Sequence, residues 1–378
     1  MERTEHPLLS PSLGHQKTLV SFQYGDPQAR PKAYLQASLH AEELPGMLVA
    51  HHLRPLLEAA EREGRLRGQV VLVPAANPIG LSQRLNHRAM GRFEFGSAQN
   101  FNRHFPALAE AVFDTVRERL GPDPQANVAL VRRAVGAWLR DWRPASELDS
   151  QRRRLFLLAH DADLVLDLHC DWEAVLHLYA EEACWAPLAP LAWLLGCRAV
   201  LIARDSGGSP FDESLSGLWW QLAERLKAAG VKHPLPQGCA SCTVELRGEA
   251  DVAHHHAEAD AQAIMDFLQH SGVIEGPPID LPEPSCRATP LAGSETLHSP
   301  VPGLVVFHAR PGDVLAAGDL VAEVIDPTAA GASRVQRVCA GVSGTLYACI
   351  GERYVVAGGE LCKIAGATPF RTGPLLGA

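Results

Sequence analysis

Residues 33–43 read AYLQASLHAEE, an apolar run that ends in His40 and, three residues later, Glu43. The length and composition of the run predict a buried strand. A second apolar run, residues 163–168, ends in the same way at His169. Open α/β sheets collect their ligands where strands end, so we expect these three side chains to meet in space. Two histidines and one carboxylate form the ligand set of a catalytic zinc site, with one position left for water.

Two further segments are expected to reach the same place. Residues 69–78 have the pattern of a buried strand that ends in an Asn-Pro turn, and an arginine-rich loop follows. Residues 242–246 predict another short strand, which carries Glu245 among apolar neighbours. Burial raises the pKa of a carboxyl group toward the range useful for a general base. The alternative is an edge-strand glutamate that faces water.

Five motifs follow one another along the chain: His40-Ala41-Glu42-Glu43, Asn77-Pro78, Asn102-Arg103-His104-Phe105-Pro106, Asp167-Leu168-His169 and Thr243-Val244-Glu245-Leu246. In this order and context they resemble the succinylglutamate desuccinylase/aspartoacylase family, which is related in fold to the zinc carboxypeptidases. The resemblance covers roughly residues 30–270. As an ordered set the motifs are specific, although none of them is specific alone.

The resemblance implies that one zinc ion per chain is held by His40, Glu43 and His169 and that Glu245 acts as the catalytic base. It also implies that Asn102 and Arg103 hold a substrate carboxylate. A guanidinium group suits that task because it offers two parallel donors to a planar carboxylate.

Asn100 stands two positions before the Asn-Arg pair, where the family usually has an acidic residue, and this puts the local hydrogen bonding of the pair in question. A further arginine normally polarises the scissile carbonyl. Arg84, Arg88 and Arg92 compete for that role, because residues 81–99 form a longer loop than is typical of aspartoacylases. We favour Arg92 as the catalytic arginine and expect Arg84 to bind substrate.

The composition is that of a soluble globular protein, with 378 residues, 47% hydrophobic and 20% charged. A net charge of −9 argues against a nucleic-acid partner, and we interpret the three arginines at 152–154 as a solvated helix face.

The most apolar stretch, residues 185–203, is interrupted by prolines and therefore predicts a short helix and a strand, not a membrane span. The N-terminus lacks the apolar core of a signal peptide, and nine cysteines without even spacing suit a reducing compartment, so a cytoplasmic location is expected.

Short apolar segments alternate with helical stretches between about residues 30 and 270. This alternation predicts the α/β class, as an α/β/α sandwich around a mostly parallel or mixed sheet, which the resemblance makes a zinc-carboxypeptidase type. Expected strands lie near 33–39, 69–76, 163–168, 174–179, 198–203 and 242–247, and expected helices near 42–60, 107–120, 127–140, 146–160, 212–229 and 251–269.

Three consecutive histidines, His254, His255 and His256, fall in the last expected helix. Successive residues of a helix point about 100° apart, so the three cannot bind one ion together. Solvated surface histidines are the favoured interpretation.

We expect residues 1–275 to form the catalytic α/β domain, 276–287 a proline-rich linker and 288–378 an all-β barrel-sandwich domain. The Gly-Asp turns of the last part resemble biotinyl and lipoyl carrier domains. Those carriers need a lysine at a hairpin tip, and residues 303–362 contain none. A swinging arm is therefore excluded, and a lid, a substrate gate or an oligomer contact remains.

These observations predict a zinc-dependent amidohydrolase that removes the acyl group from an N-acyl amino acid or a related small carboxylate. A metallocarboxypeptidase acting on short peptides is one alternative, because it would share every catalytic residue. A non-catalytic zinc- or ligand-binding protein is another, but it would have an incomplete site. The sequence leaves a homo-oligomer open and does not identify the acyl group.

Overall fold

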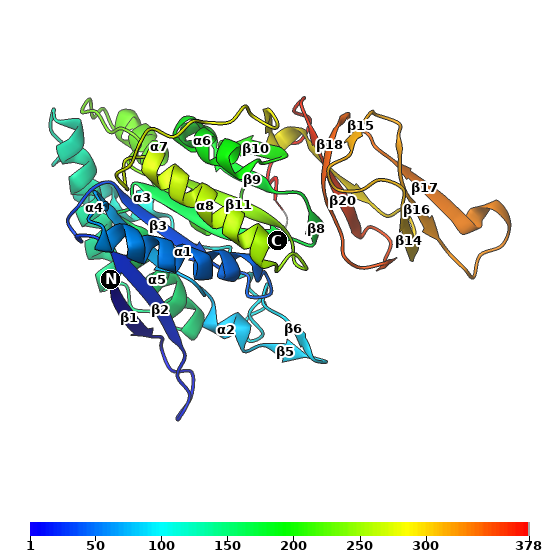
Figure 1. Cartoon of the computed structure of the whole chain (residues 1–378), viewed down its shortest axis with the longest axis horizontal. Coiled ribbons are helices and arrows are strands. Elements are labelled where there is room, and N and C mark those ends of the chain that lie inside the picture. The colour runs from blue at the N-terminus through cyan, green and yellow to red at the C-terminus, as the bar shows by residue number, and fades with distance from the viewer. Residues whose placement is uncertain (377–378) are drawn as a thin grey trace.

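The computed structural model describes residues 1–376. Its larger part is a layered α/β body, and its smaller part, formed by the C-terminal residues, is built of strands (Figure 1). Within the described residues, one nine-stranded sheet runs through the body in the order β1-β2-β4-β3-β7-β11-β9-β10-β12. The strands are β1 (Glu2–Pro7), β2 (Thr18–Tyr24), β3 (Lys32–Ala37), β4 (Gln69–Val73), β7 (Leu164–Asp171), β9 (His177–Glu181), β10 (Ala199–Ala203), β11 (Ala240–Gly248) and β12 (Ala288–Pro290).

The middle of this sheet is parallel. Strand β3 pairs in parallel with β4 and β7, and β7 pairs in parallel with β11. Strand β9 is antiparallel to β11 and parallel to β10, which makes the sheet mixed, as predicted. The carboxyl ends of β3, β7 and β11 therefore lie at the same edge of the sheet, where an open α/β sheet places its ligands.

Helices cover both faces of the sheet. One face carries α1 (Pro45–Arg62), α6 (Trp185–Leu195) and α8 (His254–His270), and the other carries α3 (Leu108–Val116), α4 (Pro124–Asp141), α5 (Glu147–Ala159) and α7 (Phe211–Ala228). Strand alternation separates the two cores: Leu35 of β3 packs with the first set, and Tyr34 packs with the second. Each buried leucine contributes roughly 1.5–3 kcal/mol, so the two cores fix the strand ends firmly.

The predicted α/β/α sandwich is confirmed, and each predicted helix and strand of the body has a counterpart within a few residues. Strands β1 and β2, which form an antiparallel edge of the sheet, were not predicted. Strand β1 is mostly exposed and polar, so no apolar run marks it in the sequence.

The C-terminal part consists of two small sheets with an apolar core between them. One sheet has the order β13-β20-β18-β15, with β8 also paired to β18, and the other has the order β17-β16-β14-β19. These strands are β8 (Glu173–Ala174), β13 (Ser294–His298), β14 (Gly303–Phe307), β15 (Val314–Leu315), β16 (Leu320–Ile325), β17 (Val335–Cys339), β18 (Gly344–Cys349), β19 (Tyr354–Val355) and β20 (Glu360–Gly366).

The two parts are joined by more than the chain between them. Strand β12 lies at the edge of the large sheet, although the sequence places residues 288–290 in the C-terminal domain. Strand β8, which follows β7 in the body, pairs in turn with β18. A shared apolar cluster contains Leu201 of the body with Leu291 and Tyr347 of the C-terminal part. The β part is thus held against the end of the body that carries the β7 exit.

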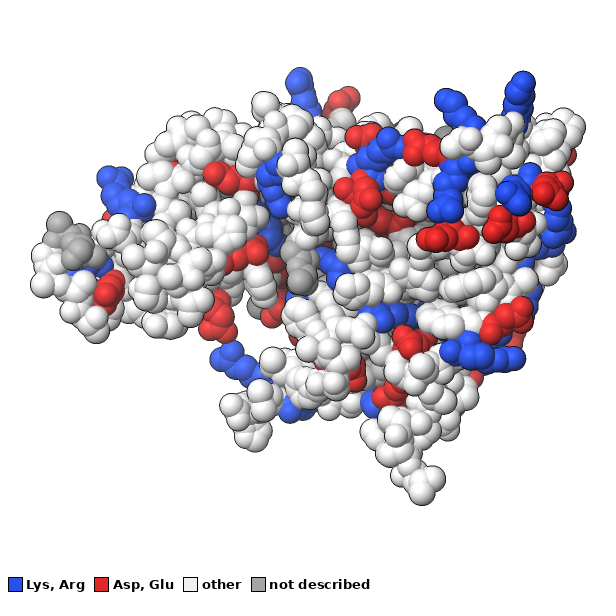
Figure 2. Space-filling view, turned by 180° about the vertical axis from the view of Figure 1, so that it is seen from behind, with Lys and Arg blue, Asp and Glu red and all other residues white. Residues whose placement is uncertain are grey.

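Acidic and basic side chains are interspersed over the face of the molecule shown in Figure 2. Among the helices of residues 1–376, none combines the length and the apolar character needed to cross a bilayer.

Candidate active site

His40, Glu43 and His169 converge in the buried interior at the carboxyl ends of β3 and β7. Their potential ligand atoms all lie within 4.8 Å of one another. The Glu43 carboxylate lies between the two imidazoles, with Oε1 2.8 Å from His40 Nδ1 and Oε2 2.7 Å from His169 Nδ1. The exposed fraction of each residue is 4% or less. The structure thus brings together the three side chains that the two strand-end motifs predicted.

The other nitrogen of each imidazole is already held by a neighbouring side chain. His40 Nε2 lies 2.8 Å from Asn100 Oδ1, and His169 Nε2 lies 3.0 Å from Asp167 Oδ2. Ligand histidines in metal sites usually donate the second ring N–H to such an oxygen, which fixes the tautomer and leaves the first nitrogen free to bind. The donor set therefore fits a metal ion held through both Nδ1 atoms and Glu43.

The turn that carries His40 and Glu43 is fixed by local contacts. Ser38 adopts a positive φ of 56°, and its hydroxyl donates to the Glu43 carbonyl at 2.8 Å. The Ala41 amide donates to the Gly91 carbonyl at 3.0 Å. A side chain at Gly91 would place its Cβ 2.6 Å from Ala41 Cβ, so the loop can approach the turn only with glycine at this position.

The protonation states suit a cation-binding triad. Burial, together with the Arg92 guanidinium, lowers the pKa of His40 to about 4, so this imidazole is neutral at pH 7. Burial opposes ionisation of Glu43, but the two imidazoles hold the pKa of Glu43 well below its usual value. Burial likewise opposes charge on His169, but the Asp167 and Glu43 carboxylates raise the pKa of His169 well above its usual value. A metal ion would compete directly with that proton.

Glu245 lies beside the triad on the neighbouring strand. In the parallel pairing of β7 and β11 it is directly opposite His169, so both side chains point to the same face of the sheet. Burial and the Glu43 carboxylate raise the pKa of Glu245 to about 8. Within residues 1–376 its Oε2 has no hydrogen-bond partner, which leaves this oxygen available to a water molecule or a substrate.

The structure separates the three competing arginines. Arg92 Nη2 lies 3.1 Å from Glu43 Oε1, and Arg92 lines the same cavity as the triad. Arg84 and Arg88 lie in the exposed hairpin of β5 (Arg84–Leu85) and β6 (Arg88–Ala89), and Arg88 donates to Glu352. Arg84, which was expected to bind substrate, is not among the residues that line the cavity. Arg92 is thus the arginine that the fold places at the triad.

Asn102 and Arg103 also line the cavity. Asn102 Nδ2 lies 3.5 Å from His169 Nε2, and its Oδ1 accepts from the Phe211 amide at 2.8 Å. Asn100 Oδ1 accepts from the Asn102 backbone amide at 2.8 Å and also lies 2.8 Å from His40 Nε2. Asn100 thus supplies an acceptor oxygen at the position where the family usually has an acidic residue.

Arg152 holds this loop from behind, and its role was not predicted. Only 4% of it is exposed, and its guanidinium donates to the Gln99 side chain and to the carbonyls of Asn100 and Arg103. The interpretation of residues 152–154 as a solvated helix face was therefore wrong for Arg152. A basic triplet in a helix gives no sign of which side chain turns inward to satisfy buried carbonyls.

The cavity has a volume of about 690 Å³, and the C-terminal part supplies part of its wall. Lys363 of β20 reaches Asp171 at the end of β7, with Nζ 2.7 Å from Oδ2. Tyr347, His298 and Phe370 also line the cavity. None of these four residues carries a motif that local sequence could reveal, because each acts across the boundary between two parts of the chain.

Asp212 at the start of α7 was not predicted either. It lines the cavity, and burial together with the Asp167 carboxylate raises the pKa of Asp212 to about 6.

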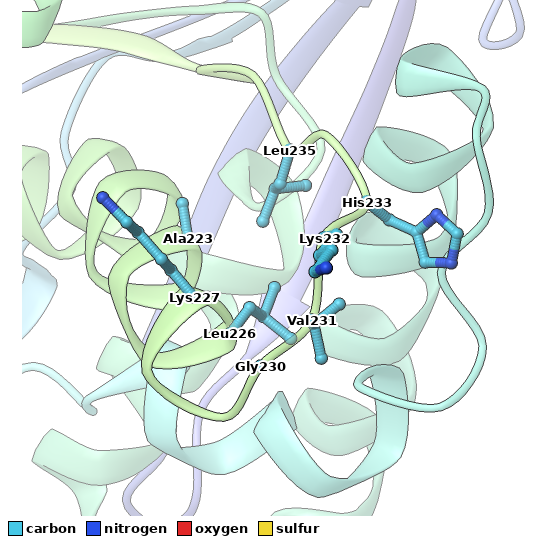
Figure 3. A pocket seen from close by; sticks show the side chains of 8 residues that line it. All are labelled: Ala223, Leu226, Lys227, Gly230, Val231, Lys232, His233 and Leu235. Atoms are coloured by element: carbon cyan, nitrogen blue, oxygen red, sulfur yellow. The ribbon is translucent and has the colours of Figure 1, made fainter.

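A second hollow, of about 510 Å³, lies at the end of α7 (Figure 3). Ala223, Leu226, Val231 and Leu235 form its apolar lining, with Lys227, Lys232 and His233 around it. None of the predicted site residues is among them, so the chemistry is concentrated in the first cavity.

Comparison with known proteins agrees with this geometry. Residues 29–122 match the family model of the succinylglutamate desuccinylase/aspartoacylase catalytic domain. A succinylglutamate desuccinylase/aspartoacylase family protein from Shewanella amazonensis superposes with a TM-score of 0.84 at 26% identity, over 97% of this chain and 98% of that one. The predicted resemblance to this family is confirmed.

Two further structures support the fold alone. A succinylglutamate desuccinylase/aspartoacylase from Shewanella frigidimarina has a TM-score of 0.82 at 23% identity, with 97% of both chains covered. The ectoine utilization protein EutE (DoeB) from Ruegeria pomeroyi has a TM-score of 0.66 at 18% identity, over 97% of this chain and 95% of that one. Curated proteins give no match to the sequence. The activities named in the family, desuccinylation and aspartoacylase activity, are hydrolytic, and this chain carries a candidate metal triad.

Proposed function

We propose that the protein is a zinc-dependent deacylase that cleaves the amide bond of an N-acyl amino acid or a related small carboxylate. The observation that carries this proposal is the convergence of a buried His-His-Glu triad, a glutamate of raised pKa and an arginine in one cavity. A purely structural metal site would not need the last two.

His40 and His169 would hold the ion through their Nδ1 atoms, together with Glu43. A bound Zn²⁺ supplies Lewis acidity toward the amide carbonyl and lowers the pKa of a bound water toward ~7. Asn100 and Asp167 fix the two ligand imidazoles, and this support limits reorganisation during turnover.

Glu245 would accept the proton of the attacking water and return it to the leaving nitrogen. Its place opposite His169 and its partnerless Oε2 support this role. A cation held by Glu43 would offset the repulsion between the two carboxylates and so bring the pKa of Glu245 down from its raised value.

Arg92 would stabilise the negative charge that develops on the carbonyl oxygen. Its guanidinium lies against Glu43 and at the cavity, and burial of this group is offset by surrounding carboxylates that raise its pKa. Removal of a single such donor costs on the order of 3 kcal/mol in other enzymes. Asn102 and Arg103 would bind the carboxylate of the substrate beside it.

The nine cysteines are free thiols in the described structure, which supports the cytoplasmic location that we propose. The partner is then a small cytoplasmic metabolite.

Metal content and a substrate panel test the proposal together. We expect zinc at the triad, its loss in His40→Ala and His169→Ala with the fold retained, and hydrolysis of at least one N-acyl amino acid by the zinc-loaded protein. Elemental analysis, circular dichroism and release of free amine measure the three outcomes. Short peptides belong in the same panel, because faster cleavage of peptides than of acyl amino acids would favour the metallocarboxypeptidase instead. Triad variants that keep zinc at this site would refute the metal assignment.

The C-terminal part would act as a gate that admits only small substrates. Its residues His298, Tyr347 and Phe370 form part of the cavity wall, and Phe370 is 55% exposed, as expected of a side chain at the cavity mouth. The Phe370→Ala variant should therefore raise kcat/KM for bulky acyl groups relative to small ones by at least about tenfold.

Tyr354→Ala is the matched control for the gate, because Tyr354 is 63% exposed on β19 and does not line the cavity. Kinetics with an acyl-length series measure both variants. An unchanged preference in Phe370→Ala would leave the C-terminal part with a stabilising role alone.

A further inference from the structure

A second group of metal-binding side chains lies on the outer face of the α/β body, away from the cavity. It consists of His52 on α1 and of His254 and Glu258 on α8. The two helices lie side by side on the same face of the sheet (Figure 1), and Leu53 and Ala257 belong to one buried core between them. Leu53 directly follows His52 and Ala257 directly precedes Glu258 in the sequence, so these buried residues fix the backbone at two of the three positions.

The three side chains already approach the arrangement of a metal site. One potential ligand atom from each lies within 4.8 Å of the other two. His52 Nε2 is 2.9 Å from His254 Nδ1, and the two rings are perpendicular, with centroids 5.2 Å apart. His254 and Glu258 are four residues apart on one helix, so they lie on the same side, one turn apart.

Burial differs within the group in a way that suits binding. The side chain of His52 is only 18% exposed, whereas that of Glu258 is 62% exposed. The histidine is therefore held by its surroundings, and the glutamate, now 4.0 Å from His52 Nδ1, can rotate to complete a site. Histidine nitrogens and carboxylate oxygens bind Zn²⁺ at about 2.0–2.2 Å, which requires ligand atoms of one ion to lie a little more than 3 Å apart.

We propose that His52, His254 and Glu258 form a second transition-metal site, of the zinc-binding class, on the surface of the protein. The imidazole that donates the shared hydrogen changes tautomer on binding, so that His52 Nε2 and His254 Nδ1 both face the ion unprotonated and each ring carries its hydrogen on its other nitrogen. Water completes the coordination on the solvent side. The site then joins α1, which begins at Pro45 directly after the inner triad's first motif, to α8, which follows the strand of Glu245.

The neighbouring histidines provide a matched control. The rings of His255 and His256 lie against each other at an interplanar angle of 42°, with centroids 4.0 Å apart, and neither residue is in the group around His52. A replacement of these two removes as many imidazoles as a replacement of His52 and His254, from the same surface, without touching the proposed ligands.

The test is a zinc titration of the full-length protein, followed by calorimetry, with bound metal counted after dialysis. The unmodified protein is expected to take up two ions, one inner and one outer, and the second ion is expected to raise Tm because it binds only the folded state. The double variant His52→Ala/His254→Ala should lose only the outer ion and its effect on Tm. The Glu258→Gln variant should lower the affinity for the outer ion by at least about tenfold. His255→Ala/His256→Ala should keep both ions.

The outcome does not depend on the proposed function. The double variant His40→Ala/His169→Ala should lose the inner ion and keep the outer one. The number of zinc ions bound by each variant therefore shows which of the two proposed sites is absent. The inference is overturned if the unmodified protein takes up no second ion, or if His52→Ala/His254→Ala keeps it. It is equally overturned if the ion is lost from His255→Ala/His256→Ala, because the ligands would then be different residues.

Discussion

Two groups of two histidines and one glutamate lie in different regions of this molecule, and they share little beyond composition. The inner group, His40, Glu43 and His169, is buried at the strand ends of the sheet. The outer group lies on the helices α1 and α8, and its glutamate is mostly exposed. If the ligands alone decided function, the two would be equivalent.

Their surroundings differ in three respects. Both inner imidazoles are held at Nε2 by neighbouring side chains, Asn100 and Asp167. A guanidinium, Arg92, contacts the inner carboxylate, and Glu245 with its raised pKa lies beside it. The inner group also opens into a cavity of about 690 Å³. The comparison indicates that catalytic character comes from the groups around the ligands, and the proposed role of the outer site is to link two helices.

The Glu245→Gln variant should have the largest effect on turnover, because it removes the proposed base and leaves the metal ligands in place. It keeps the shape of the side chain but removes the base, so turnover should fall by at least ~100-fold while both metal ions remain. Steady-state kinetics and metal analysis measure the two quantities. Normal turnover in this variant would remove Glu245 from the mechanism.

The pH dependence of kcat/KM tests the role of Glu245 independently. A base must be ionised, so kcat/KM should rise with pH through the pKa of Glu245. Burial raises that pKa from 4.5 toward 8, so the rising limb should lie between these values. The limb should disappear in Glu245→Gln, because glutamine has no proton to lose in this range.

The inner site could be predicted from the sequence because its residues sit at the ends of apolar runs. Such runs fix the strand, and the topology of a parallel sheet then places His40 and His169 at one edge. The register between β7 and β11 then places Glu245 directly opposite His169. The fold class followed from the same alternation of strands and helices.

Other features had no local signal. The outer group joins His52 to His254, which are 202 residues apart, and helix periodicity does not say which helices pack together. Lys363 meets Asp171 across the boundary between the body and the C-terminal part. Arg152 turns inward from a basic triplet that has a surface composition. These contacts depend on tertiary packing, which composition and periodicity do not encode.

The Asp167→Asn variant tests how much the contact between Asp167 and His169 contributes to metal affinity at the inner group. Asp167 Oδ2 lies 3.0 Å from His169 Nε2, and its Oδ1 accepts from Gln36 at 2.9 Å, so an amide can keep only one of the two acceptors and loses the charge. The affinity of the inner ion should fall by about 10–100-fold. The outer ion is the control within the same titration, and its affinity should not change. Equal weakening of both ions would show a general loss of structure instead.

Arg103→Lys should have the smallest effect, because it leaves both metal groups and the base untouched. Arg103 lines the cavity, its Nη1 donates to the Asn102 carbonyl at 2.8 Å, and its stem packs on Gly208, where a Cβ would come within 2.7 Å of Arg103 Cδ. Lysine keeps the charge but loses the two parallel donors to a carboxylate. A lost hydrogen bond to a charged group costs about 1.5 kcal/mol, so the preference for an acyl amino acid over its amide should fall about tenfold, with zinc content unchanged. Arg88→Lys, in the exposed hairpin before it, should leave that preference intact. Competition between the free acid and the amide measures the ratio, and an unaltered ratio in Arg103→Lys would assign carboxylate recognition to another residue of the cavity wall.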